Sequence, residues 1–252
     1  MIMNNHKFLK VVTDSFKKFL ESGSHSNEKL KILHGAIAKD ISDKLNRFSG
    51  FSKTSERFRV SSLGFGDGKE SDIQGRYIDK KVDITIVNKA NGVVSAGIAV
   101  KFVMQNYFQN SNNYFENMLG ETANIRCKGI PYFQIFIIPD KIPYYKKDGK
   151  IEKWECFSIG NSHKYEILAS DNPDCYFHTP NKMLLFVVHI PELGKRVSTK
   201  KDYVRSYFNR SGLMLKETAM PYNTLRCLQE SSVIFNDYEK FIDKICHSVL
   251  AI

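Results

Sequence analysis

Apolar residues recur at helical spacing in two stretches of the first fifty residues. The first stretch comprises Phe8, Leu9, Val12, Phe16, Phe19 and Leu20, and the second comprises Leu30, Leu33, Ala36, Ile37, Ile41 and Leu45. Ser22-Gly23-Ser24 separates the two stretches, and Ser49-Gly50 follows the second. Because residues three and four apart share one face of a helix, residues 1–50 are predicted to form two amphipathic helices.

The middle of the chain alternates between strand and helix patterns. Residues 82–87 and 97–102 alternate with period two around an Asn88–Gly92 turn, and continuous apolar runs at 132–138 and 183–188 are typical of buried strands. A helix is expected near 105–125, a loop at 63–76, and a hairpin around 147–149, in which Trp154 packs with its neighbours. The last forty residues are expected to be helical, with an apolar stripe comprising Phe235, Tyr238, Phe241, Ile242 and Ile245. This order predicts one α/β domain over residues 1–252.

Composition and charge limit the functional class. The chain has 252 residues, of which 42% are hydrophobic and 25% charged, and this excludes a disordered tail and a collagen-like repeat. Its 37 basic and 27 acidic side chains leave a net charge of +10, which favours a nucleic-acid partner over an acidic membrane surface. Five widely spaced cysteines without a C-x-x-C pair, and no apolar run of spanning length, predict a cytoplasmic protein without a disulfide framework.

The predicted hairpin at 82–102 places charged and very small residues on one face. Side chains alternate across a strand, so Asp83 and Thr85 are expected beside Gly97, Ala99 and Lys101, opposite a core face that includes Val82, Ile84 and Ile86. Small neighbours would let a bulky ligand approach. A carboxylate can hold Mg²⁺, and a lysine can orient an attacking water or stabilise a phosphate, so the pair suits phosphodiester hydrolysis. The alternative is a simple ion pair between neighbouring strands.

The segment Val82-Asp83, followed after a gap by Ala99-Val100-Lys101, resembles the PD-(D/E)xK nuclease core. The amide-rich stretch and helix after Lys101 resemble those of type II restriction endonucleases, over roughly residues 70–140. The resemblance implies a restriction-endonuclease-like central mixed β-sheet flanked by helices. The spacing of apolar residues adds a helical part at 1–50 and a basic, mostly helical part at 195–252. It also implies Mg²⁺-dependent, sequence-specific cleavage of double-stranded DNA, usually by a homodimer in a bacterial cytoplasm, with a companion DNA methyltransferase. Asp83 would then be a metal ligand, Lys101 the base or phosphate stabiliser, and the Val100 carbonyl a further ligand.

One position departs from the family pattern. Ala99 stands where the family places an acid, and some family members draw the second acid from the following helix instead. Glu116 is the candidate for that acid and metal ligand, with Glu121 in reserve, and Glu70 and Asp72 are further possible ligands. The alternative is that Glu116 is a solvated helix residue.

Two segments are candidate DNA contacts. The segment after Lys101 is rich in amide side chains, which can bind base edges and phosphates. These include Gln105, Asn106, Asn110, Asn112 and Asn113. A later basic segment with interleaved tyrosines contains Lys195, Arg196, Lys200, Lys201 and Arg205. The alternatives are a compositional bias for the amides and an ordinary charged surface for the basic segment.

The sequence favours a DNA endonuclease of restriction type and leaves two other functions open. One is a non-catalytic DNA-binding module on the same fold, in which Ala99 marks a lost site. The other is a structure-specific DNA repair nuclease. Gly64-x-Gly66-x-Gly68 lacks the Lys-Ser/Thr of a phosphate loop, and the scattered histidines define no metal site or triad.

Overall fold

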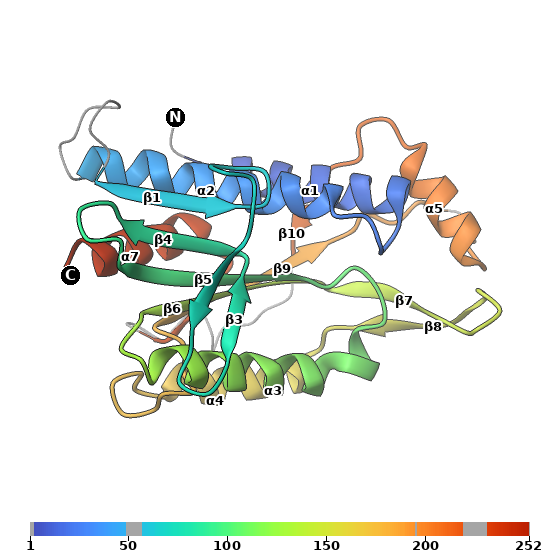
Figure 1. Ribbon diagram of the computed structural model, residues 1–252. Coiled ribbons are helices and arrows are strands. Elements are labelled where there is room, and N and C mark those ends of the chain that lie inside the picture. The colour runs from blue at the N-terminus through green and yellow to red at the C-terminus, as the bar shows by residue number, and fades with distance from the viewer. Residues whose placement is uncertain (1–2, 49–56, 195, 219–230, 252) are drawn as a thin grey trace.

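The computed structural model describes residues 3–48, 57–194, 196–218 and 231–251, and it shows a central sheet between two layers of helices (Figure 1). Helix α1 (Asn5–Ser22) begins where the Asn4 side chain accepts a hydrogen bond from the Lys7 amide at 3.0 Å, and it ends at Gly23. Helix α2 (Glu28–Phe48) follows after a short turn. The two predicted N-terminal helices are therefore confirmed.

The main sheet has seven strands and mixed polarity. Its path runs β1-β4-β5-β6-β9-β10, and β11 also pairs with β9. The strands β1, β4 and β5 are antiparallel, whereas β5, β6, β9 and β11 are parallel. The strand bounds are β1 Phe58–Ser62, β4 Ile84–Asn88, β5 Val94–Phe102, β6 Tyr132–Pro139, β9 Lys182–His189, β10 Lys216–Glu217 and β11 Val233–Phe235.

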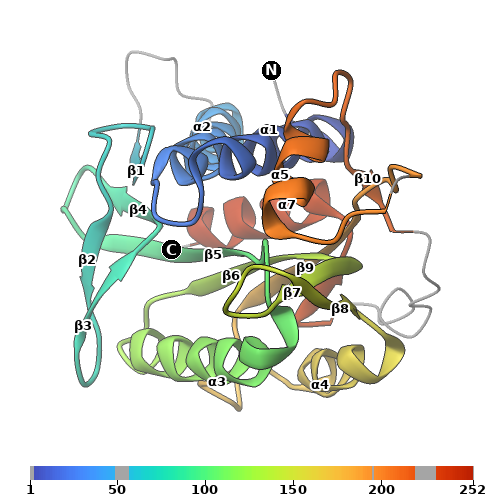
Figure 2. The ribbon, with the colours of Figure 1, turned by 90° about the vertical axis from the view of Figure 1, so that its right-hand side faces the viewer.

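Helices cover both faces of this sheet. Figure 2 shows α1, α2 and α7 (Tyr238–Leu250) on one face and α3 (Tyr107–Arg126) and α4 (Ile159–Ser170) on the other, with α5 (Lys200–Phe208) beside α1. Because β6 and β9 are covered on both sides, their residues are apolar almost throughout, as the runs at 132–138 and 183–188 predict. The predicted α/β class, with a mixed sheet flanked by helices, is confirmed at this level. Within the described ranges, no helix is long and apolar enough to span a lipid bilayer.

Two small hairpins stand outside the main sheet. Strands β2 (Ser71–Gln74) and β3 (Asp79–Val82) form one, and β7 (Lys141–Tyr145) and β8 (Ile151–Cys156) form the other. The second confirms the hairpin predicted around 147–149. The first shows that the prediction of a loop over 63–76 is wrong for residues 71–74, because these residues pair with β3 instead of remaining unpaired.

The strand predicted at 82–87 is not continuous. The chain bends at Asp83, so β3 ends at Val82 and β4 begins at Ile84. As a result Val82 joins a small second core with Ile73, Ile125 and Tyr132, whereas Ile84 and Ile86 lie in the main core. The expectation that all three residues share one face is therefore wrong for Val82.

The small residues of β5 are also more enclosed than the sequence suggests. A Cβ atom at Gly97 would lie 2.8 Å from the Ile73 side chain and 3.0 Å from the Tyr132 ring. The β2–β3 hairpin and β6 thus fill the space over Gly97, and the surface open to a ligand begins further along β5.

The C-terminal part contains strands as well as helices. Phe235 lies in β11 and not on the predicted helix, because residues 233–235 extend the sheet beside β9. Tyr238, Phe241, Ile242 and Ile245 do form the buried stripe of α7. Residues 195, 219–230 and 252 lie outside the described residues. In the described parts of 195–252, helices α5 and α7 alternate with strands β10 and β11, so these parts do not support the expectation of a mostly helical segment.

The glycine-rich loop after β1 packs against helix α2. A Cβ atom at Gly35 would lie 2.9 Å from the Gly64 carbonyl oxygen, and one at Gly64 would lie 2.4 Å from the Lys31 carbonyl oxygen. Side chains at these two positions would separate the loop from the helix. This contact also holds Glu70, at the end of the loop, on the same side of the molecule as α2.

The close contact at Gly64 gives a stability prediction. Gly64 and Gly68 both have a positive φ, but only Gly64 approaches another backbone, since a Cβ at Gly68 meets nothing within 4 Å. Gly64→Ala should therefore lower the free energy of unfolding by about 1–3 kcal/mol more than Gly68→Ala, measured by urea denaturation. Equal losses for the two variants would contradict the packing described here.

Candidate active site

Asp83 lies where β5 loses its neighbouring strand. The register pairs Ile84 with Ile98, so β4 provides no partner for β5 beyond that point. The Val100 amide donates to the Asp83 carboxylate at 2.7 Å instead. In an extended strand the N–H and C=O of one residue point to the same edge, so the Val100 carbonyl faces the Asp83 side as well.

Lys101 follows on the opposite face of β5 from Val100 and lines the same pocket as Asp83. Its ammonium nitrogen lies 4.3 Å from the centre of the Tyr114 ring, a cation–π distance that steadies the flexible side chain. Burial is the largest influence on both pKa values, but the charge of Lys101 acts to lower the pKa of Asp83 and the charge of Asp83 acts to raise the pKa of Lys101, so the two groups lie within electrostatic reach of each other. The predicted juxtaposition of the two side chains is therefore present.

A possible cation site lies at Asp83. One nitrogen of His34 and one carboxylate oxygen each from Glu70 and Asp83 lie within 4.8 Å of one another. His34 is 1% exposed, and neither of its ring nitrogens has a hydrogen-bond partner among the described residues, although Nδ1 lies 3.8 Å from Asp83 Oδ1. A buried imidazole without hydrogen bonds is costly, and a cation bound by these three groups would give one of its two ring nitrogens a partner. This group could hold a metal ion.

Helix α3 presents Glu121 to the pocket, not Glu116. Tyr114, Met118 and Glu121 share the helix face that lines it, because residues four and seven apart lie on one side. Glu116 is exposed and does not line the pocket, whereas the reserve candidate Glu121 does. Glu121 forms an ion pair with Lys80 of β3, which ties the hairpin to the helix.

Asn124 secures the same hairpin one turn further along α3. Its side-chain oxygen accepts from the Tyr77 amide at 2.9 Å, and its side-chain nitrogen donates to the Ile78 carbonyl at 2.8 Å. The turn between β2 and β3 is thus fixed to α3, and the Asp83 bend follows directly after this hairpin.

The pocket has a volume of about 440 Å³, and its wall combines charged and polar groups from both helix layers. Besides His34, Asp83, Lys101 and Glu121, it includes Gln134 and Tyr132 of β6 and the turn between α1 and α2. Gln134 is buried and donates to Thr122 at 3.4 Å, and the Tyr132 hydroxyl has no hydrogen-bond partner in the described part of the chain. The arrangement joins two carboxylates, four lysines and neutral polar groups on one open concavity.

Burial shifts the ionisation of the site. It raises the pKa of Asp83 to about 6 and outweighs the hydrogen bond from the Val100 amide, which lowers this pKa. The negative charge of Glu121 adds to the rise. Burial also raises the pKa of Glu70, where the charge of Asp83 adds to the effect. Burial lowers the pKa of His34 to about 4, so this imidazole is neutral at pH 7 and free to act as a ligand. Burial lowers the pKa of Lys101, which makes proton transfer by its amine easier.

The predicted DNA contacts are dispersed, with one point of convergence. Gln105 and Asn106, ahead of α3, and Lys200, at the start of α5, line one hollow of about 610 Å³ with the β7–β8 hairpin. The other amides lie along α3: Asn110 donates to the Asn106 carbonyl at 3.5 Å, Asn112 accepts from Lys164 at 3.3 Å, and Asn113 is exposed. Of the remaining basic residues, Lys201 is exposed, Arg205 pairs with Asp202 at 3.1 Å, Arg196 lines a different pocket, and Lys195 lies outside the described residues.

Two site residues escape sequence reasoning. His34 falls on the apolar stripe of α2 with Leu30, Ile37 and Ile41, and a histidine on such a stripe is the signal that could have revealed it. Gln134 interrupts the apolar run of β6 in the same way. Asp72, a further candidate ligand, is exposed and pairs in register with Lys81, so it does not join the site.

The raised pKa of Asp83 predicts a pH-dependent stability. The folded protein keeps a proton on Asp83 up to about pH 6, whereas the unfolded chain loses it near the ordinary value of 3.8. Ionised Asp83 therefore destabilises the fold above pH 6 and has no such effect below about pH 4. In chelator, Asp83→Asn should raise the melting temperature at pH 8 by roughly 2–4 °C, since about 1 kcal/mol remains after screening at this partly exposed site.

The matched control is Asp14→Asn on the exposed face of α1. Its melting temperature should follow that of the parent protein at both pH values. A stabilisation by Asp83→Asn that persists unchanged at pH 4 would contradict the assignment of the shift to burial of the charge.

Comparisons with known proteins add nothing to this geometry. No protein-family model, no curated protein and no solved structure matches the chain. The resemblance to PD-(D/E)xK nucleases consequently rests on the residues of this chain alone.

Proposed function

We propose that the protein is a metal-dependent DNA endonuclease and that the pocket around Asp83 and Lys101 is its active site. The observation that carries the proposal is that an acid and a lysine, on segments that meet at one edge of β5, line a single open pocket beside a possible cation site. A net charge of +10 supports a polyanionic substrate. Sequence-specific cleavage of double-stranded DNA with Mg²⁺, of the restriction type, is the form of this activity that the motif favours.

The proposed roles follow from the positions of the side chains. Asp83, Glu70 and His34 would hold the cation, and the Val100 carbonyl faces the same side. A bound cation makes a coordinated water more acidic and neutralises charge on the phosphate. Lys101, with its lowered pKa, would orient or deprotonate the attacking water or stabilise the phosphorane as a positive charge.

Glu121 takes the role that the sequence assigns to Glu116. Its carboxylate lines the pocket and acts electrostatically on both Asp83 and Lys101. Since Ala99 supplies no acid, Glu121 and Glu70 together provide the missing negative charge. The presence of these acids favours a nuclease over a DNA-binding module that has lost its site.

Cleavage of mixed plasmid and phage DNA tests the activity. With Mg²⁺ or Mn²⁺ the parent protein should produce discrete fragments, and Asp83→Asn should lower the rate by about 10³-fold because the cation loses a charged ligand. Lys101→Ala should lower it by about 10²–10⁴-fold. Asp14→Asn is the matched control for charge. A gel shift without cleavage by the parent protein would refute the enzyme and leave the DNA-binding module.

A pair of variants on α3 separates the two candidate acids. Glu121→Gln should reduce the cleavage rate at least tenfold, because its charge acts on both Asp83 and Lys101, about 1.4 kcal/mol of transition-state stabilisation. Glu116→Gln, five residues earlier and exposed, should change the rate less than twofold. A larger loss of cleavage rate in Glu116→Gln than in Glu121→Gln would identify Glu116 as the second acid.

His34 predicts a preference among divalent cations. Imidazole nitrogen suits transition metals better than Mg²⁺, which prefers oxygen ligands. In calorimetric titrations the parent protein should bind Mn²⁺ at least about tenfold more tightly than Mg²⁺, and His34→Leu should abolish most of this difference. The control is His25→Leu, since His25 is exposed between α1 and α2. An unchanged preference in His34→Leu would remove His34 from the ligand set.

A further inference from the structure

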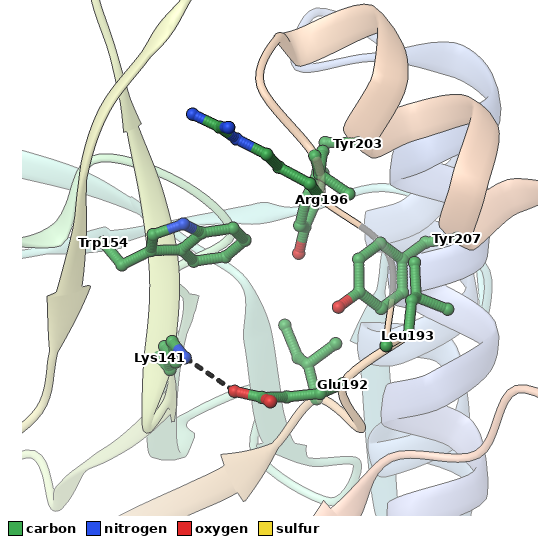
Figure 3. Close-up of a pocket in the computed structure, with 10 residues that line it drawn as sticks. Lys141, Trp154, Glu192, Leu193, Arg196, Tyr203 and Tyr207 are labelled. Atoms are coloured by element: carbon green, nitrogen blue, oxygen red, sulfur yellow. Dashed lines mark hydrogen bonds and ion pairs between the residues drawn. The ribbon is translucent and has the colours of Figure 1, made fainter.

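A second hollow of about 360 Å³ lies between the β7–β8 hairpin and helix α5 (Figure 3). Trp154 of β8 forms one wall, and Tyr203 and Tyr207 of α5 form the opposite one. The segment that follows β9 completes the hollow with Leu193 and Arg196. Its volume lies at the lower end of the range for small-molecule sites, roughly 300–1,000 Å³.

The Tyr203 hydroxyl points into this hollow without a hydrogen bond. Tyr203 is 2% exposed, and its hydroxyl has no hydrogen-bond partner among the described residues. Figure 3 shows the hydroxyl groups of Tyr203 and Tyr207 directed into the space between Trp154 and Leu193. A buried hydroxyl without a partner costs free energy that a ligand with a polar edge would recover.

The walls of the hollow suit a flat aromatic ligand. Trp154 is 38% exposed although it is a large aromatic side chain, so hairpin packing alone does not account for it. Its ring centre lies 6.1 Å from that of Tyr203, and the Tyr203 and Tyr207 rings are 4.6 Å apart. Tyr203 and Tyr207 are buried, so Trp154 is the exposed ring of the hollow, and an exposed indole binds heterocyclic bases by stacking, whichever base is present.

Charged groups surround the aromatic walls. Arg196 lines this hollow and also an adjoining one, where Arg205 and Arg210 lie. At another edge, Lys141 pairs with Glu192 at 2.6 Å, which leaves carboxylate and ammonium groups beside the hollow (Figure 3). An aromatic slot next to a group of arginines provides separate places for a base and for its phosphate.

We propose that this hollow binds a single nucleotide. The base stacks on Trp154 and hydrogen-bonds to the Tyr203 hydroxyl, and the phosphate lies toward Arg196 and the adjoining arginines. This binding needs neither a cation nor cleavage, so the proposal goes beyond the nuclease activity and does not depend on it. The nucleotide is either free or part of a DNA strand whose base leaves the stack, and both present the same chemistry to the pocket.

Trp154 is the only tryptophan of the chain, so its fluorescence reports on this hollow specifically. The full-length protein is titrated in chelator with each nucleoside monophosphate, and separately with a short single-stranded oligonucleotide and a duplex carrying one extrahelical base. Saturable quenching by a monophosphate identifies a free nucleotide as the ligand. Quenching by the single strand or extrahelical base alone identifies a nucleotide within DNA.

Two tyrosine variants make the test specific for the hollow. Tyr203→Phe removes only the unpartnered hydroxyl and should weaken the quenching titration by about tenfold. Tyr165→Phe is the control, because Tyr165 is equally buried but does not line the hollow. No quenching by any ligand, or equal weakening by the two variants, would overturn the proposal. The same titration on Asp83→Asn should be unchanged, so failure of nuclease activity and failure of nucleotide binding are read separately.

Discussion

The site depends on one unpaired edge. Beyond Ile98, the edge of β5 that faces β4 pairs with no strand of the described residues, because the chain bends at Asp83 before β4 begins. Backbone amides at a sheet edge need a partner, and the Asp83 carboxylate accepts the Val100 N–H in place of a strand. This bond fixes the carboxylate beside the residue that precedes Lys101. The bend that interrupts the strand is thus the same feature that brings the acid to the lysine.

Close packing from both helix layers then completes the pocket. On one side, the contact between Gly64 and α2 holds the glycine-rich loop near His34, so Glu70 and His34 approach Asp83 from different segments. On the other side, Asn124 and Glu121 tie the β2–β3 hairpin to α3. The result is a pocket in which Asp83 and Glu121 stand among lysines, with Glu70 beside Asp83. Burial keeps the pKa values of Asp83 and Glu70 raised until a cation or another positive charge compensates them.

Two concavities of the protein differ in their chemistry. The pocket at Asp83 joins acids to Lys101, which suits a cation and a phosphodiester. The hollow at Trp154 joins aromatic rings to Arg196, which suits a base and its phosphate. The hollow that holds Gln105, Asn106 and Lys200 lies against the β7–β8 hairpin, which also contributes to the aromatic one. This hairpin is therefore the element on which the proposed nucleic-acid contacts converge.

The sequence by itself determined the two N-terminal helices, the buried strands at 132–138 and 183–188, and the hairpin that pairs residues 84–87 with 94–98, because periodicity and turn residues are local properties. Only the tertiary structure decided that Asp83 lies at a bend, that Glu121 and not Glu116 faces the pocket, and that His34 joins Glu70. These outcomes depend on which face of a helix meets the sheet and on contacts between residues far apart in the chain. Spacing along a sequence cannot specify them, since a helix rotated by one residue presents a different side chain to the same surface.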